Sequence, residues 1–180
     1  MNHVVYRKLP YDLMRDLTPV TQLISVPNML VVHPSLPVKT LGEFIALAKA
    51  KPGQITYGSA GAGSNLHLAL ELLRYRAGID LVHVPYKGVT PALQDTLAGH
   101  VQSMISNVPS GKPHVDAGKL RALAVTSRAR VAAMPDIPTI AESGIDGYEV
   151  LNWFGLFAPA GTPQPSADRM QHEAAAMMAD

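Results

Sequence analysis

The chain has 180 residues, a formal net charge of +1, and 47% hydrophobic and 16% charged residues. This length suffices for one sizeable core or two small lobes. Basic residues are not clustered, which argues against a nucleic-acid partner; the lack of cysteine excludes disulfides and thiol sites; and no apolar run reaches the roughly 18 residues of a membrane span.

The first part of the chain predicts strand, crossing segment and helix in turn. Residues Val20–Val32 are apolar and β-branched, which predicts one kinked strand or two short ones. Two prolines stiffen His33–Pro37, so we expect this segment to cross between lobes. Thr40 and Glu43 have the spacing of a capping box, which predicts a helix start. No apolar signal-peptide core occurs in Met1–Arg7, so we expect no export signal in this chain.

Strands and helices then alternate without long gaps up to residue 126. The predicted strands are Gln54–Tyr57, Leu81–Tyr86, Val101–Ser106 and Arg121–Thr126. The predicted helices begin near Thr40, Ser64, Thr90 and, for a short helix within a loop, Pro109. This alternation is typical of a parallel, doubly wound sheet and predicts an α/β fold.

The last part of the chain repeats some of these signals. Met134–Pro138 resembles a second crossing segment, and Thr139–Glu142 is a second capping box that predicts a short helix. An aromatic strand at Tyr148–Phe157 and a helix at Ser166–Met178 follow. The two proline-marked crossings predict a complete α/β lobe over residues 35–146, with 1–34 and 147–180 forming a partial first lobe.

The sharpest local feature is the glycine-rich turn Gly58–Ser64 between a predicted strand and a predicted helix. Helix N-termini carry unpaired N–H groups and partial positive charge, so they hold anions. Glycines let the backbone approach a ligand closely, and Ser59 and Ser64 add hydroxyl groups. The turn therefore predicts an anion site, although a capped turn without a ligand explains the same residues.

Three catalytic or nucleotide-binding motifs do not fit this turn. A Walker loop needs a lysine where Ser64 stands, and a dinucleotide fingerprint needs glycine where Leu66 stands. A nucleophile elbow needs glycine where Tyr57 stands. These mismatches argue against phosphate hydrolysis and dinucleotide binding.

His67 follows the turn and leaves an enzymatic alternative open. Ser59 or Ser64 with His67 invites a serine-hydrolase hypothesis, but no acid is placed by spacing to orient the histidine. The histidines also lack HxH or HxxxH spacing, and His172 has no second histidine near it. We therefore expect neither a metal nor another cofactor, and no enzyme.

Two further predicted strand ends carry polar residues. Lys87 follows one strand and could steer an anion, while Ser106 and Asn107 end the next. In open α/β sheets ligands lie at the carboxyl ends of strands, and asparagine offers both a donor and an acceptor. A surface lysine and a turn-capping asparagine are the alternatives. Small polar groups without an acid–base pair predict a recognition site.

Several long motifs, in one order, resemble the Bug/TctC family. They are Tyr57–His67, Val82–Gly88, Gly118–Thr126 and Trp153–Pro163, together with Leu9–Asp12 and Asp136–Thr139. The family comprises extracytoplasmic solute receptors of tripartite tricarboxylate transport systems. The resemblance implies a periplasmic-binding-protein-like fold of two α/β lobes, a periplasmic location, and membrane permease subunits as partners.

The resemblance also implies a ligand and the residues that bind it. The ligand is a small carboxylate: a di- or tricarboxylate, an aromatic acid or an acidic amino acid. The turn is then the anion clamp of the second lobe. The residues expected to bind ligand follow strand ends and are Ser59, Ala60, Gly61, Gly63, Ser64, His67, Lys87, Ser106 and Asn107.

Two departures from the family pattern modify these expectations. Where the family commonly has aspartate, this chain has Ser106, which favours a more acidic solute or one without an amino group. The chain also starts after the family's first strand–loop–helix unit and ends before its last helices. We therefore expect a partial first lobe whose exposed sheet edge leads to homo-oligomers or to weak stability. A truncated remnant that binds nothing remains an alternative.

Overall fold

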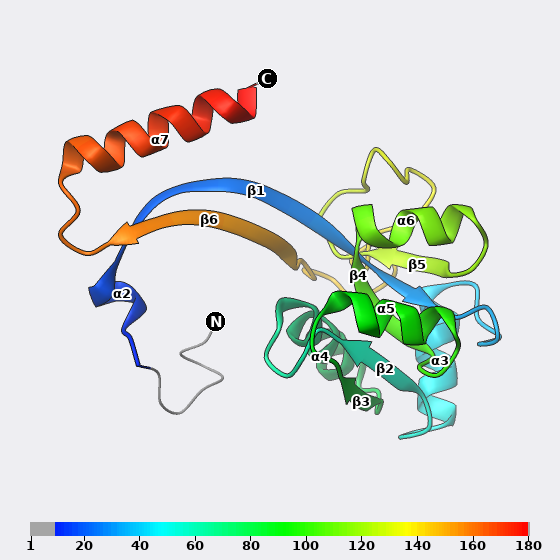
Figure 1. Cartoon of the computed structure of the whole chain (residues 1–180). Coiled ribbons are helices and arrows are strands. Elements are labelled where there is room, and N and C mark those ends of the chain that lie inside the picture. Colours follow the sequence, from blue (N-terminus) through cyan, green and yellow to red (C-terminus); the bar gives the residue numbers. More distant parts are fainter. Residues whose placement is uncertain (1–9, 180) are drawn as a thin grey trace. The chain divides into compact units, whose positions relative to one another are not determined.

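The computed structural model describes residues 10–179, arranged as alternating strands and helices (Figure 1). The strands are β1 (Leu17–Val32), β2 (Thr56–Ser59), β3 (Val82–Pro85), β4 (Ser103–Asn107), β5 (Arg121–Val125) and β6 (Leu151–Pro159). The helices are α2 (Leu13–Asp16), α3 (Leu41–Ala50), α4 (Asn65–Ala77), α5 (Val89–Leu97), α6 (Val108–Asp116) and α7 (Gln164–Ala179). The start of the motif Leu9–Asp12 and the segment Met1–Arg7 lie outside the described residues.

The sheet has the strand order β3-β2-β4-β1-β5, with β6 paired to β1. β2 pairs in parallel with both β3 and β4. β1 runs antiparallel to β4 and to β5. The predicted α/β fold with a mostly parallel sheet is confirmed, and β1 is its antiparallel member. Among the described residues only the short helix α2 and no strand precedes β1, so the alternation of strands and helices could not indicate its direction.

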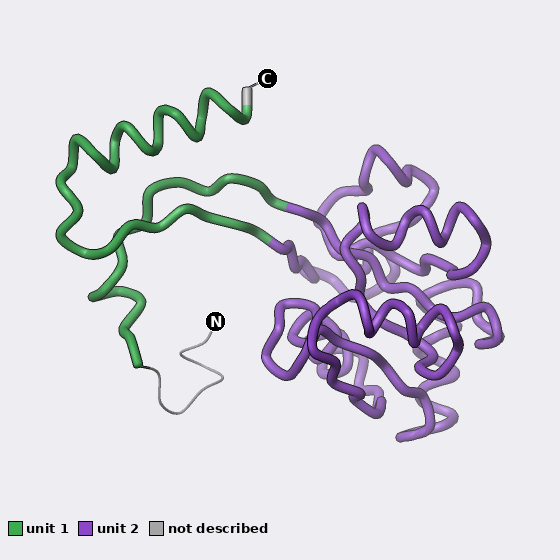
Figure 2. Tube along the Cα trace, in the orientation of Figure 1, with its two compact units in different colours: residues 1–25, 153–180 green, residues 26–152 purple. Residues whose placement is uncertain are grey.

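The chain divides into two compact units (Figure 2). Unit 1 comprises residues 1–25 and 153–180, and unit 2 comprises residues 26–152. These bounds differ from the predicted ranges 1–34, 147–180 and 35–146. The difference arises because Asn28–Val32, at the end of β1, pair with β4 and β5 and so belong to unit 2. Both proline-marked segments lie inside unit 2, and the chain passes between units within β1 and β6 instead.

The two predicted capping boxes form, with different outcomes. The Thr40 hydroxyl accepts from the backbone N–H of Glu43 at 3.2 Å, and α3 follows. At the second box the N–H of Glu142 donates to the Thr139 hydroxyl at 2.9 Å, and the N–H of Thr139 donates to the Glu142 carboxylate at 2.8 Å. The predicted helix after Thr139 is instead a series of turns that closes at Gly144. A capping box satisfies the first N–H groups but does not itself propagate a helix.

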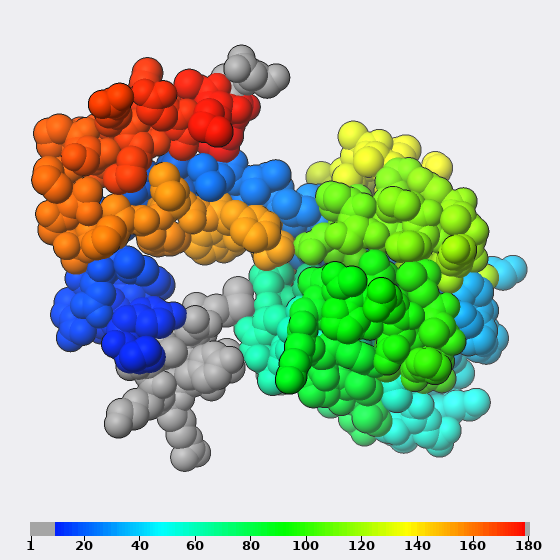
Figure 3. Space-filling model, in the orientation of Figure 1, coloured from blue at the N-terminus to red at the C-terminus, as the bar shows by residue number. Residues whose placement is uncertain are grey.

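Helices cover both faces of the unit 2 sheet. Leu41 and Phe44 from α3, with Leu70 and Leu73 from α4, belong to one buried cluster. Ala92 and Leu93 from α5 and Val108 from α6 belong to the other. In Figure 3, atoms of the α5 and α6 region, coloured green to yellow-green, form a large part of the visible face of unit 2. Unit 2 is therefore a doubly wound lobe with a core on each side of its sheet.

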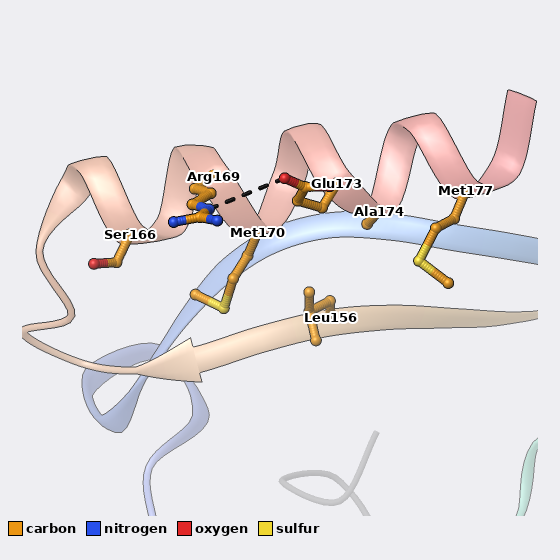
Figure 4. Close-up of a pocket in the computed structure, with 7 residues that line it drawn as sticks. All are labelled: Leu156, Ser166, Arg169, Met170, Glu173, Ala174 and Met177. Atoms are coloured by element: carbon orange, nitrogen blue, oxygen red, sulfur yellow. Dashed lines mark ion pairs between the residues drawn. The ribbon is translucent and has the colours of Figure 1, made fainter.

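Unit 1 has far less core. Among its described residues, only Ala158 and Ala167 are buried apolar side chains. Figure 4 shows α7 lying along β6, with Met170 and Met177 pointing toward the side on which Leu156 lies. Unit 1 is a two-stranded ribbon with the helices α2 and α7 and few buried apolar side chains, which is close to the lower limit of independent stability, so unit 2 holds most of the folding free energy.

Replacing Leu73 by alanine tests the position of the core. Leu73 is fully buried in α4, and truncation removes packed methyl groups, so we expect the free energy of unfolding to fall by about 2–5 kcal/mol. Tyr75 in the same helix is 85% exposed, and Tyr75→Ala is expected to change it by less than about 0.5 kcal/mol. Urea denaturation of both variants measures the difference; equal losses would contradict the assigned core face.

Candidate functional site

The glycine-rich turn connects β2 to α4 and lies against the end of β3. The backbone N–H of Tyr86 donates to the carbonyl of Ser59 at 3.0 Å. Gly61 has φ +123°, and a Cβ built on it would lie 3.2 Å from the Tyr86 carbonyl oxygen. A side chain at this position would meet rigid backbone, so the conformation and the close approach both require glycine.

Hydrogen bonds within the turn use some of its backbone donors and leave others unused. The N–H of Gly61 donates to the Ser59 hydroxyl at 3.2 Å, and the N–H of Ser64 donates to the Gly61 carbonyl at 3.1 Å. Ser64 is the N-cap of α4, and its hydroxyl accepts from the N–H of His67 at 3.2 Å. Within residues 10–179, no protein acceptor meets the N–H groups of Ala60, Ala62, Asn65 and Leu66. These donors, at the positive end of α4, can bind an anion.

Two histidines support the turn from its protein side. His67 Nδ1 accepts from the N–H of Gly63 at 3.2 Å, and His83 Nε2 lies 2.7 Å from the Ser59 hydroxyl oxygen. Their ring centroids are 4.1 Å apart, and the His83 ring stacks on Tyr57 at 4.8 Å. Sequence reasoning singled out His67 but missed His83, which lies one strand away.

Charged groups lie beside the two rings. The hydroxyl of Tyr57 donates to Glu71, and Arg74 Nη1 donates to the same carboxylate at 2.7 Å. Burial raises the pKa of Glu71, but the hydrogen bonds from Tyr57 and Arg74 outweigh it and hold this pKa below its usual value. Burial lowers the pKa of His83, and the charge of His67 lowers it further. At neutral pH the site therefore contains a charged Glu71–Arg74 pair beside a neutral His83.

An asparagine cluster includes Asn65, the first residue of α4. The side chain of Asn107 donates to the Asn28 side-chain oxygen at 2.6 Å. Asn28 Nδ2 lies 3.5 Å from the Asn65 side-chain oxygen, and Asn65 Nδ2 donates to the Leu151 carbonyl at 3.2 Å. Sequence reasoning predicted Asn107 but missed Asn28 and Asn65. A fully buried asparagine in the apolar strand β1 was the available signal for Asn28.

Ser106 and Lys87 are placed differently from the other predicted residues. Ser106 is fully buried, and its hydroxyl oxygen lies 3.1 Å from a Cβ built on Gly111 in α6. Side chains alternate along β4, so Ser106 faces α6 whereas Asn107 faces Asn28. Lys87 is exposed directly after Tyr86, the residue that contacts the turn. The structure thus brings Asn107 to the site, leaves Lys87 at its margin, and buries Ser106 away from it.

The hydrolase geometry considered from the sequence is not formed. The Ser64 hydroxyl bonds to the backbone N–H of His67 rather than to its ring. Ser59 lies beside the ring of His83, not that of His67. A nucleophile needs a hydrogen bond to its base, and neither serine has one to His67.

Residues 10–179 contain no group of three or more His, Asp or Glu side chains arranged to hold a metal ion. In the same part of the chain, no helix is long and apolar enough to cross a membrane.

Comparison with known proteins identifies the family. The family model described as "Tripartite tricarboxylate transporter family receptor" matches residues 1–179. The chain belongs to this family. Its members are solute-binding receptors and not enzymes. The resemblance inferred from the sequence motifs is confirmed.

This chain aligns with only part of the length of its individual relatives. A UPF0065 protein of Pseudomonas sp. (strain P51), from the tcbD-tcbE intergenic region, is 41% identical over 93% of this chain and 50% of its own. Protein BugT of Bordetella pertussis is 40% identical over 86% of this chain and 47% of its own. The chain therefore spans about half the length of the curated relatives it matches.

Two solved structures of relatives contain carboxylates. The R. palustris protein Rpa4515 with adipate superposes with a TM-score of 0.90 at 41% identity, covering 96% of this chain and 57% of that one. MatC (Rpa3494) from Rhodopseudomonas palustris with bound malate has a TM-score of 0.88 at 32% identity, covering 99% and 60%. Adipate and malate are both dicarboxylates.

Replacing Gly61 by alanine tests the constraint on the turn. The new Cβ meets the Tyr86 carbonyl in addition to straining φ, so we expect a loss of about 2–3 kcal/mol in unfolding free energy. Gly118 has φ +69° with open space where a Cβ would stand, so Gly118→Ala measures backbone strain alone, about 1 kcal/mol. Chemical denaturation compares the two. Equal losses would show that the contact with Tyr86 is unimportant.

Proposed function

We propose that this chain belongs to a receptor that captures a small carboxylate for a tripartite tricarboxylate transporter, and that the carboxylate binds at the N-terminus of α4. The observation that carries the proposal is the set of unused N–H groups at Ala60, Ala62, Asn65 and Leu66. Anions are stabilised at such positions by directed donors and by the helix dipole together. A bound carboxylate accepts from these N–H groups, and Asn107 and Asn65 supply amide groups beside it.

The proposed solute is a dicarboxylate without an amino group. Rpa4515 with adipate and MatC with malate, both related to this chain, support the dicarboxylate class. Ser106 offers no charge, and its side chain is buried away from the turn, so unit 2 places no carboxylate there to pair with a ligand ammonium group. Tricarboxylates, aromatic acids and acidic amino acids are the competing solutes. A binding screen in which amino acids outcompete simple dicarboxylates would contradict this choice.

The remaining parts of the proposal rest on family membership. The partners are the membrane permease subunits of the transporter, and the location is the periplasm, as for the related periplasmic binding protein BugD. No residue is assigned a catalytic role. Because the chain spans about half the length of its curated relatives, a folded domain that binds no solute is the alternative outcome.

Two substitutions at Asn65 test the role of the backbone donors. Asn65 is the first residue of α4, where proline fits the helix and removes only an N–H that lacks a protein acceptor. Asn65→Ala keeps this N–H and removes the same side chain. We expect calorimetry with adipate and malate to show affinity about tenfold weaker for Asn65→Pro than for Asn65→Ala, as expected for one hydrogen bond to a charged group.

The outcomes of this experiment separate the alternatives. Equal affinities for the two variants would show that the carboxylate does not bind at the N-terminus of α4. No saturable heat from the folded parent chain with adipate, malate, citrate, benzoate or aspartate would support the non-binding domain.

We further propose that the chain self-associates through unit 1. The ribbon of β1 and β6 exposes Ile24, Trp153 and Phe154, each more than half accessible to solvent. An open strand edge beside exposed apolar side chains favours pairing with another chain.

Analytical ultracentrifugation over a range of concentrations tests self-association. We expect the parent chain to form dimers or larger species and Trp153→Glu to shift the population toward monomer, because a charge at the ribbon opposes its burial. Tyr75→Glu, at an exposed position of α4 in unit 2, is the matched control and is expected to leave the distribution unchanged. A parent chain that remains monomeric at every concentration would contradict the proposal.

A further inference from the structure

Two histidines hold the turn at two different points, and their bonds differ in how they respond to a proton. His67, in the first turn of α4, accepts from the N–H of Gly63 through Nδ1 at 3.2 Å. His83, in β3, meets the Ser59 hydroxyl through Nε2 at 2.7 Å. The first bond needs a bare ring nitrogen, whereas a hydroxyl can donate to a neutral ring or accept from a charged one. Only the bond between Gly63 and His67 is therefore lost on protonation.

The second nitrogen of His67 determines where its neutral form carries the proton. Nε2 lies 3.9 Å from the Glu71 carboxylate. An N–H at Nε2 therefore faces a negative charge, and Nδ1 stays free to accept from Gly63. A further proton on Nδ1 would direct an N–H against the N–H of Gly63. The hydrogen bond would be replaced by a repulsive contact, and the turn would have to move away from α4.

The surroundings of the pair oppose two positive charges. The ring centroids of His67 and His83 are 4.1 Å apart. The titratable and charged groups beside them, among the described residues, are Tyr57 from β2 and Glu71 and Arg74 from α4. Glu71 is shared with Arg74, so it neutralises a second cation only in part. Burial and the neighbouring charges of His67 and Arg74 lower the pKa of His83, which keeps His83 neutral to lower pH.

We propose that His67 is a positioning residue that holds the anion-binding turn in shape only while its ring is uncharged, so that carboxylate binding weakens on acidification. This inference rests on the proposed carboxylate site. It assigns His67 a role other than the ligand contact expected from the sequence, because its accepting nitrogen is engaged by Gly63. Bound carboxylate and a proton on His67 then oppose each other through the turn, as linkage requires.

A direct electrostatic role for His67 predicts the opposite sign. If a charged imidazolium attracted the ligand, affinity would rise as pH falls, because opposite charges at short range are stabilised. In the proposed mechanism the protonated form loses the bond from Gly63, so affinity falls on acidification. The sign of the pH dependence therefore distinguishes the two roles.

The test is calorimetric titration of the folded chain with adipate between pH 8 and pH 5.5. His67→Asn places a side-chain oxygen near the position of Nδ1, where it accepts from Gly63 but does not titrate. We expect the affinity ratio between pH 8 and pH 5.5 to be about tenfold larger for the parent chain than for His67→Asn, since one net hydrogen bond is worth about this factor. His172→Asn, on the exposed part of α7, is the control and should keep the ratio of the parent chain.

Comparing ratios removes the protonation of adipate itself, which is the same for every variant. An affinity that rises in acid, or equal ratios for the parent chain and His67→Asn, would overturn the proposal.

A second measurement does not require a ligand. In a two-dimensional NMR titration, the amide of Gly63 should shift with pH through a histidine transition in the parent chain and not in His67→Asn. An amide that does not titrate in the parent chain would overturn the inference even if carboxylates bind. Conversely, a titrating Gly63 amide in a chain that binds no carboxylate would leave the positioning role intact and refute the proposed function.

Discussion

The carbonyl oxygen of Tyr86 lies where a side chain on Gly61 would have to be, and the geometry of the site follows from this contact. Because Gly61 is pressed against the end of β3, the chain must bend back sharply to begin α4 directly after its N-cap, Ser64. The bend turns the carbonyl of Gly61 toward the N–H of Ser64 and leaves neighbouring N–H groups without an acceptor among residues 10–179. A β-strand, a helix and the short turn between them thus create a concentrated set of donors without any charged side chain.

The cores on the two sides of the sheet keep this bend in place. Leu66 and Leu70 are buried in the cluster that fixes α4 against β2, so the helix N-terminus cannot shift to accommodate a looser turn. Unit 1 lacks an equivalent support, since its described residues bury only Ala158 and Ala167 as apolar side chains. Rigidity is thus concentrated in the unit that carries the proposed site.

Local signals were sufficient to predict much of unit 2. The Ser64 cap, the Thr40 capping box and the terminating Gly78 depend on neighbouring residues, and the structure contains all three. The direction of β1 and the unit boundary depend on which strands pair, and that information is spread over residues far apart in the chain.

The same contrast between local signals and contacts distant in the sequence explains which site residues could be predicted. Glycines and serines of the turn were visible as a motif. His83, Asn28 and Asn65 enter the site only through contacts across the sheet, which no spacing along the sequence reveals. The position of Ser106 also depends on the sheet. It stands next to Asn107 in the sequence, but the alternation of side chains along β4 sends the two to opposite faces, and only the register of β4 against β1 shows which is which.

The asparagine cluster has a mechanical consequence. Asn28 lies just beyond the point where β1 enters unit 2, and Val150 lies just before the chain leaves it. The Thr126 hydroxyl donates to the Val150 carbonyl at 2.5 Å and accepts from the backbone N–H of Asn28 at 3.2 Å. The Asn65 side chain is hydrogen-bonded to Leu151 and Asn28. Entry and exit are thereby fastened to each other and to the first residue of α4. The strands that link the two units therefore meet, at their unit 2 ends, on hydrogen bonds that include the first residue of α4.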